Sequence, residues 1–134
     1  MSTNRFKRID HVEIVIPSDE FDETIDFFSD VFGFKIKSRQ GGPPDSQLRE
    51  IVYMKLGGSV IELMSVENPD GISQSAFQTG YRMIAIEVDD MDGTMDYLEG
   101  KGIEITWGPK TIGESVRAEI NTPGGLPIEL REWW

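Results

Sequence analysis

The sequence contains no cysteine and only one histidine, His11. Without cysteine there are no disulfide bonds and no thiolate metal sites, and the redox compartment is left undetermined. No Ser-His-Asp hydrolase arrangement is readable around the one histidine. Basic residues are also scarce, because 13 Lys and Arg stand against 24 Asp and Glu for a net charge of −11. Such a surface repels a phosphate backbone, so we expect no nucleic acid partner.

Long apolar runs are also missing. No stretch approaches the roughly 20 apolar residues of a membrane-spanning helix, and the segment from Met1 to Lys7 lacks the apolar region of a secretion signal. We therefore expect a soluble, cytoplasmic protein with no membrane partner. Neither Gly-Gly pair has the spacing of a phosphate-binding loop, so no nucleotide cofactor is expected.

What the chain does contain is an internal repeat. Gly57–Leu63 reads Gly-Gly-Ser-Val-Ile-Glu-Leu, and Gly124–Leu130 reads Gly-Gly-Leu-Pro-Ile-Glu-Leu. Upstream segments repeat in the same order, since residues 24–28 correspond to 94–98 and residues 33–36 to 102–105. These matches predict a duplicated module that is longer than the repeat of a solenoid.

Apolar periodicity and turn residues predict the same order of elements in both halves. In the first half we expect strands at 9–16, 34–38, 48–56 and 59–65, and a helix from Asp19 or Glu20 to about Val31. In the second half we expect strands at 82–88, 103–107, 115–121 and 126–131, and a helix from about Met91 to Glu99. The chain is thus predicted to be one domain, residues 1–134, with two βαβββ modules (about 8–65 and 82–131) joined by residues 66–81.

These segments resemble the vicinal oxygen chelate superfamily, which includes glyoxalase I, methylmalonyl-CoA epimerase, extradiol dioxygenases and fosfomycin or bleomycin resistance proteins. The resemblance covers essentially the whole chain and rests on Arg8–Val12, Ile61–Leu63, Ile84–Asp90 and Asn121–Leu130. It implies an α+β, glyoxalase-like fold, in which two tandem βαβββ modules form a curved mixed sheet that encloses a cleft. It also implies dimerisation, so we expect a homodimer.

Three residues on the predicted strands are the main candidates for a functional site. His11 shares a strand face with Glu13, while Glu62 and Glu129 hold equivalent places in the two modules. If a pseudo-twofold axis relates the modules, both carboxylates and His11 converge on one point. One imidazole nitrogen and two carboxylate oxygens suit Zn, Ni, Co, Mn or Fe, and the resemblance implies metal ligands at these three positions. Judged singly, each is more often a surface acid or a core histidine.

Met83 stands where the metal enzymes of the resembling family usually have a second histidine. A thioether is a poor ligand for borderline divalent ions, so we expect Met83 to pack rather than coordinate. Two interpretations stay open. With a metal that polarises a carbonyl, Glu129 or Glu62 would be the catalytic residue that moves a proton at the neighbouring carbon. Without metal, two facing carboxylates would raise the pKa of one of them and give a general acid or base.

Further residues are weaker candidates for a substrate pocket. They are Glu13, Tyr53, Met64, Met83, Trp107 and Arg117. Arg117 could neutralise an anionic substrate or pair with one of the many acids, and core packing explains most of the apolar ones equally well.

The pattern as a whole favours a glyoxalase-like enzyme of the isomerase or lyase type. Its reaction would be metal-assisted proton transfer on a small substrate with vicinal oxygens. Two alternatives stay open. A metal-free small-molecule binding or drug-resistance protein is favoured by Met83 and by the negative charge, and a metal-free acid/base enzyme on the same fold lies between the two.

Overall fold

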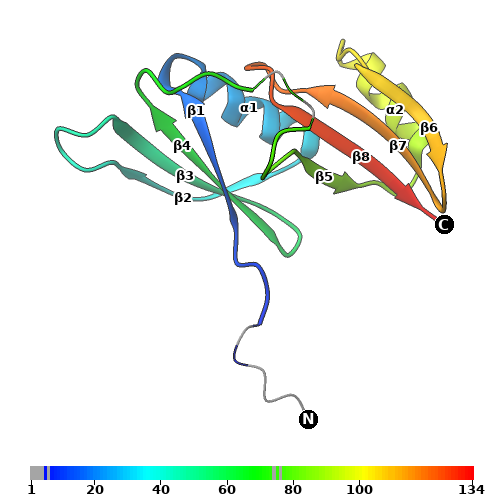
Figure 1. Ribbon diagram of the computed structural model, residues 1–134, viewed down its shortest axis with the longest axis horizontal. Helices are drawn as coiled ribbons and strands as arrows, with labels where there is room; N and C mark the ends of the chain where they lie inside the picture. The colour runs from blue at the N-terminus through cyan, green and yellow to red at the C-terminus, as the bar shows by residue number, and fades with distance from the viewer. Residues whose placement is uncertain (1–4, 6, 74, 76) are drawn as a thin grey trace. The chain divides into compact units, whose positions relative to one another are not determined.

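The computed structural model describes residues 5, 7–73, 75 and 77–134 (Figure 1). The expectation about residues 1–7, and the part of the predicted joint at 74 and 76, therefore lie partly outside the described residues. Contacts divide the chain into two compact units, one ending at Pro69 and the other beginning at Asp70. No helix in the described part of the chain is both long and apolar enough to cross a membrane.

The first unit has one helix and one four-stranded sheet. Its elements are β1 (Val12–Pro17), the 3-10 turn η1 (Ser18–Glu20), α1 (Phe21–Phe32), β2 (Lys35–Gly41), β3 (Leu48–Leu56) and β4 (Ser59–Val66). The strand order is β1-β4-β3-β2, where β1 runs parallel to β4 and the other neighbours are antiparallel.

The second unit repeats this arrangement. Its elements are β5 (Ile84–Glu87), α2 (Met91–Gly100), β6 (Trp107–Ile112), β7 (Ser115–Asn121) and β8 (Pro127–Trp133). The order β5-β8-β7-β6, with β5 parallel to β8, matches the first sheet strand by strand. The predicted α+β fold of two tandem βαβββ modules is therefore confirmed, while the single domain and the shared cleft stay predictions.

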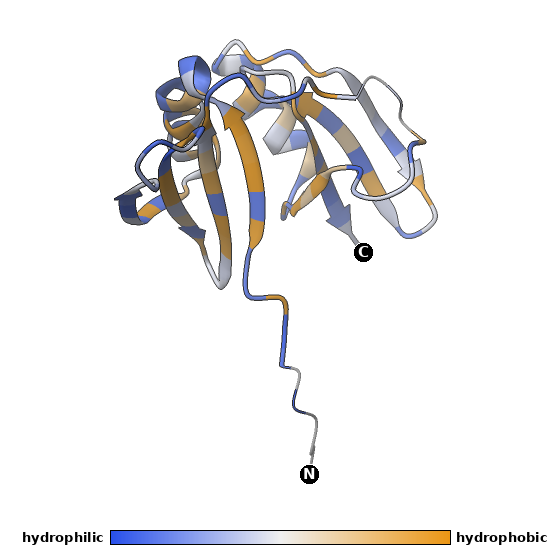
Figure 2. Cartoon of the chain, turned by 60° about the vertical axis from the view of Figure 1, so that its left-hand side comes forward, coloured by the Kyte–Doolittle hydropathy of each residue, from blue (hydrophilic) through white to orange (hydrophobic). Residues whose placement is uncertain are grey.

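The core of the first unit lies between α1 and one face of its sheet. The helix has a buried face that includes Phe21, Ile25 and Phe28, and it ends at Gly33, whose φ of 81° is in the left-handed region. The strands bury alternate residues on the same side, and Figure 2 shows the bands of different hydropathy along the strands. These sheet residues include Ile14, Ile16, Val52, Met54, Ile61 and Leu63. The opposite face of the sheet carries Glu13 and Glu62 together with apolar residues such as Val15 and Met64.

The core of the second unit is built in the same way. Ala118, Ile120, Ile128 and Leu130 are buried, as are Met91 and Leu98 of α2. Glu132 lies on this side of β8, because its Oε1 accepts a hydrogen bond from the backbone N–H of Met91 at the start of α2. The residues that lie between these positions on β7 and β8 therefore point to the sheet face away from α2.

One element was placed wrongly by the sequence pattern. The alternation of Ile103, Ile105 and Trp107 predicts a strand at 103–107, but the strand begins at Trp107 and continues to Ile112. The reason is the pairing with β7, which starts at Ile112 opposite Ser115 and reaches Trp107 opposite Glu119. The turn at Gly113, and not the apolar alternation, sets which residues join the sheet.

Candidate metal centre

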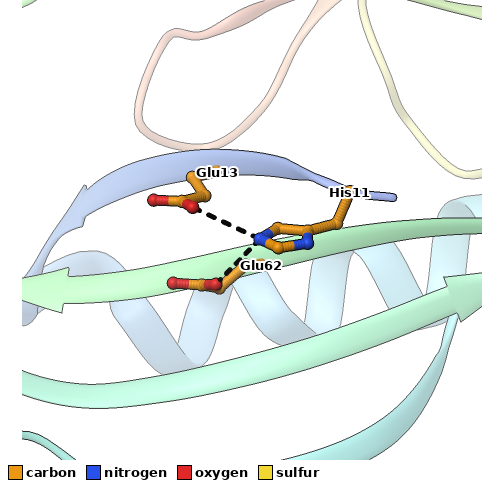
Figure 3. A group of neighbouring side chains, drawn as sticks. All are labelled: His11, Glu13 and Glu62. Carbon is orange, nitrogen blue, oxygen red and sulfur yellow. Dashed lines mark hydrogen bonds and ion pairs between the residues drawn. The ribbon is translucent and has the colours of Figure 1, made fainter. Parts of the chain in front are cut away.

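Three side chains of the first unit converge on the sheet face away from α1. His11 comes directly before β1, Glu13 lies on β1 and Glu62 lies opposite Glu13 on β4. The Nε2 atom of His11 is 3.2 Å from Oε2 of Glu13 and 3.2 Å from Oε1 of Glu62 (Figure 3). The imidazole therefore points at both carboxylates.

Two carboxylates lie side by side in this group. Glu13 and Glu62 are direct neighbours across two strands, where like charges repel. Glu62 is also nearly buried, since 7% of its side chain is exposed, whereas 58% of Glu13 is exposed. A protonated His11 or a metal ion would reduce the repulsion between the two carboxylates.

His11 is held by a further carboxylate on its other nitrogen. Nδ1 lies 2.9 Å from Oδ2 of Asp10, and this hydrogen bond is the largest cause that raises the pKa of His11 above 6.5. Burial opposes the shift, while Glu13 and Glu62 add to it. When the imidazole is neutral, Nδ1–H donates to Asp10 and the Nε2 lone pair faces the two glutamates. Carboxylate partners of this kind orient histidine ligands in metal sites.

Tyr53 completes this face from β3. It lies opposite Glu62 in the sheet, and its ring meets the His11 ring edge-on at 5.6 Å. A hydrogen bond to the carboxylate of Glu62 raises the pKa of Tyr53 above 10.0, because the neutral phenol is the form that donates. Tyr53 therefore stays protonated at neutral pH and fixes Glu62.

The donor set fits a divalent ion. One ligand atom from each of His11, Glu13 and Glu62 lies within 4.8 Å of the others. Tetrahedral zinc ligands about 2.1 Å from the ion are about 3.4 Å from each other, which is close to the 3.2 Å from Nε2 to each glutamate. Imidazole and carboxylate donors suit Zn, Fe, Mn, Co and Ni.

Glu129, the third predicted ligand, lies in the second unit. It is buried on β8, and its Oε2 accepts a hydrogen bond of 2.7 Å from Nε of Arg131. Neighbouring strands place Ala85 and Glu119 beside it. Convergence of Glu129 with His11 and Glu62 stays a prediction.

The weaker candidates fall into two groups by unit. Met64 is half-buried on β4, on the same face as Glu62. In the second unit, Met83 precedes β5, Trp107 begins β6 opposite Glu119, and Arg117 lies mid-strand on β7. Their role in a pocket stays a prediction.

The sequence pattern singled out neither Asp10 nor Arg131. Asp10 precedes His11 directly, so a carboxylate adjacent to the single histidine was a usable signal. Arg131 lies two residues after Glu129 on the same strand face, which is the spacing at which opposite charges can pair.

The sequence pattern of the Glyoxalase/Bleomycin resistance protein/Dioxygenase superfamily matches residues 8–130, which is nearly the whole chain. The chain belongs to this superfamily. The match confirms the resemblance carried by the repeated segments. It also agrees with the two βαβββ modules of the structure.

Individual members of the superfamily are distant in sequence. A lactoylglutathione lyase of Arabidopsis thaliana is 27% identical over 123 residues, which is 89% of this chain and 42% of that relative. The chain thus spans less than half the length of this curated relative. A glyoxalase family protein of Enterococcus faecalis is 23% identical, with a TM-score of 0.80 over 95% of this chain and 98% of that one.

One solved structure of similar fold is that of a binding protein. The structure of an antibiotic binding protein from a Streptomyces species is 20% identical, with a TM-score of 0.70 over 96% of this chain and 100% of that one. At these identities the solved structures show the fold alone. The superfamily therefore leaves both an enzyme and a binder open.

Proposed function

We propose that the chain is a glyoxalase-like enzyme that catalyses metal-assisted proton transfer, of the lyase or isomerase type, on a small substrate with two adjacent oxygens. The observation that carries the proposal is the convergence of His11 Nε2 with the carboxylates of Glu62 and Glu13. Three such donors suit a divalent ion such as Zn, Ni, Co, Mn or Fe.

The ion would be held by His11, Glu62 and Glu129, as the repeated segments predict. Glu13 lies within ligand distance of His11 and Glu62, so it can complete the set from the first unit. Asp10 keeps the Nε2 lone pair of His11 directed at the site, and Tyr53 holds Glu62. When bound, the ion would supply polarisation of a substrate carbonyl.

Glu129 is the residue proposed to move the proton. Arg131 holds one of its oxygens, Oε2, at 2.7 Å and so fixes the direction of the carboxylate. Oε1 is then the atom that takes a proton from the carbon beside the carbonyl. With Oε1 in that role, the ion would be held by His11, Glu62 and Glu13. The name of the Arabidopsis relative, a lactoylglutathione lyase, supports this reaction type and makes lactoylglutathione the first substrate to test.

The test compares two glutamates on one sheet face. Metal-loaded protein is incubated with hydroxyacetone or lactoylglutathione in D₂O, and exchange of the proton on the carbon beside the carbonyl is followed by NMR. Glu129→Gln is expected to abolish the reaction, because its amide cannot accept the proton. Glu119→Gln, directly across from Glu129 on β7, is the matched control and should react. Full activity of Glu129→Gln would contradict the proposal.

A metal-free binding protein is the second candidate. It is favoured by Met83 in place of a histidine and by the pairing of Glu129 with Arg131, which gives that carboxylate a partner without a metal. The fold that the chain shares with an antibiotic binding protein supports it as well. Tight binding of an organic ligand by EDTA-treated protein, with no metal uptake, would favour this candidate.

We also propose a homodimer and a cytoplasmic location. Trp133 and Trp134 are 53% and 63% exposed at the end of the chain, and large apolar side chains in water favour burial against a partner. Light scattering of the purified chain tests the dimer. A mass near 15.1 kDa at micromolar concentration would contradict it.

A further inference from the structure

The second sheet carries three basic side chains in one row across three strands. Lys110 on β6 lies opposite Arg117 on β7, and Arg117 lies opposite Arg131 on β8. Directly opposed residues of antiparallel strands point to the same face of the sheet. The row therefore puts three positive charges side by side in a chain whose net charge is −11.

This row lies on the face away from α2. Arg117 alternates with the buried Ala118, and Arg131 follows the buried Leu130. Arg131 also shares its face with Glu129, to which it donates a hydrogen bond. The basic row and the proposed catalytic carboxylate thus occupy the same side of one sheet.

The first unit provides an internal comparison. Glu62 is the equivalent of Glu129, so Met64, two residues later, is the equivalent of Arg131. The row through Met64 in the first sheet consists of Val15, Met64, Ile51 and Gln40. In the second sheet it is Glu87, Arg131, Arg117 and Lys110. A duplicated fold therefore does not need charge at these positions, because the first unit forms the same sheet with uncharged residues.

The charges in this row are only partly compensated. Arg131 pairs with Glu129 at 2.7 Å and stacks over the Trp133 ring at 5.0 Å. Lys110 lies over the Trp107 ring at 5.3 Å. Arg117 donates from Nε to the neutral hydroxyl of Ser115 at 3.1 Å and forms no ion pair with any described residue. Like charges directly opposite each other destabilise a sheet, so an unpaired, half-buried Arg117 has a cost that an anion would remove.

We propose that Arg117, with Lys110 and Arg131 beside it, binds the anionic group of the substrate, a carboxylate or a phosphate. The Nε hydrogen bond to Ser115 fixes the guanidinium plane of Arg117. The two terminal nitrogens can then donate hydrogen bonds to two oxygens of the anion. Lys110 at the exposed end adds a point charge. Glu87, at the other end of the row beside Arg131, is exposed and sets the limit of the positive region.

The position of the row defines the substrate further, and this step rests on the proposed function. Arg131 is two residues from Glu129 along β8, which is about 7 Å on a strand. The substrate would then be a small acid whose carboxylate or phosphate lies a few bonds from the carbon that loses its proton. Loss of Arg117 should raise KM for such a substrate more than it lowers kcat.

The binding itself is tested in EDTA-treated protein, so that no metal contributes. Inorganic phosphate and malonate are titrated separately while the amide signals of β7 and β8 are followed by NMR. Both are expected to shift the signals of Arg117 and its neighbours with saturation, and the tighter of the two identifies the anion. Arg117→Gln should raise the Kd roughly tenfold or more, because a charged hydrogen-bonded pair is lost.

Two variants keep the result interpretable. Arg117→Lys keeps the charge but not the planar fork, so its Kd should lie between those of the wild type and Arg117→Gln. Lys55→Gln removes an exposed charge from the first unit and should bind as the wild type does. If Arg117→Gln keeps its dispersed amide spectrum and binds both anions as tightly as Lys55→Gln, the subsite is overturned.

The outcome is separable from that of the proposed function. Anion binding by a chain that takes up no metal would support the subsite and remove the metal-assisted reaction. Metal uptake by a chain that binds neither anion would remove the subsite alone.

Discussion

The Nε2 atom of His11 lies 3.2 Å from Oε1 of Glu62, a carboxylate with only 7% of its side chain exposed. This contact joins the residue before β1 to the middle of β4, and Glu13 approaches the same nitrogen at 3.2 Å. Two carboxylates that share one imidazole nitrogen form either a proton-linked cluster or a metal site. The two states differ in how they respond to pH and to mutation.

The first prediction separates the two glutamates of the cluster. Glu62→Gln and Glu13→Gln should each weaken the binding of Zn or Ni by at least about tenfold. Glu62 should matter more, because it is the more buried and is fixed by Tyr53. Competition with a chromophoric chelator measures both affinities. Equal affinities of the wild type and Glu62→Gln would show that the cluster does not hold the ion.

The second prediction concerns the pKa of His11 in the metal-free protein. NMR titration of the imidazole should give a pKa above 6.5, since Asp10, Glu13 and Glu62 stabilise the protonated ring. Protons and metal compete for Nε2, so metal affinity should fall as pH drops through this raised pKa. Asp10→Asn removes the largest cause and should lower the pKa, whereas Asp19→Asn in η1 should not. A pKa at or below 6.5 in the wild type would contradict the geometry.

A third prediction tests the core of the first unit. Leu63 is 0% exposed on β4, and Leu63→Ala should reduce the free energy of unfolding, by about 3 kcal/mol, through lost burial and the cavity left behind. Ile36 on β2 is 47% exposed, so Ile36→Ala should cost less than about 1 kcal/mol. Urea unfolding measures both changes. Similar losses for the two variants would mean that Leu63 is not in a packed core.

The hairpin between β3 and β4 gives a fourth prediction from two adjacent glycines. Gly57 has a φ of 56°, whereas Gly58 has no left-handed φ and open space where a Cβ would project. Gly57→Ala should therefore destabilise the protein by about 1 kcal/mol, and Gly58→Ala by less than about 0.5 kcal/mol. Thermal unfolding compares them directly. A larger loss of stability for Gly58→Ala than for Gly57→Ala would contradict this assignment of the left-handed residue to Gly57.

Much of the fold could be predicted because the repeat carries local signals in both halves. The strands at 48–56 and 115–121 begin and end where apolar alternation and turn residues placed them. The strand at 103–107 failed because the partner strand, which lies later in the chain, decides which residues pair. Local alternation carries no information about that partner.

The candidate site was predictable only in part. Strand alternation put His11 and Glu13 on one face, and their contact with Glu62 follows the pairing of β1 with β4. The pairing of Glu129 with Arg131 needed side-chain positions, and the row through Arg117 needed the register of three strands. Contacts between strands depend on the register in which the strands pair, and a single sequence does not determine that register.

The metal content of the chain tests the proposed site most directly. The protein is stripped with EDTA, dialysed against Zn, Ni, Co, Mn and Fe in separate experiments, and analysed by mass spectrometry of the elements. We predict about one divalent ion per chain for at least one of these metals, with uptake lost in His11→Ala and in Glu62→Gln. No uptake of any of the five metals by the folded wild-type protein would contradict it.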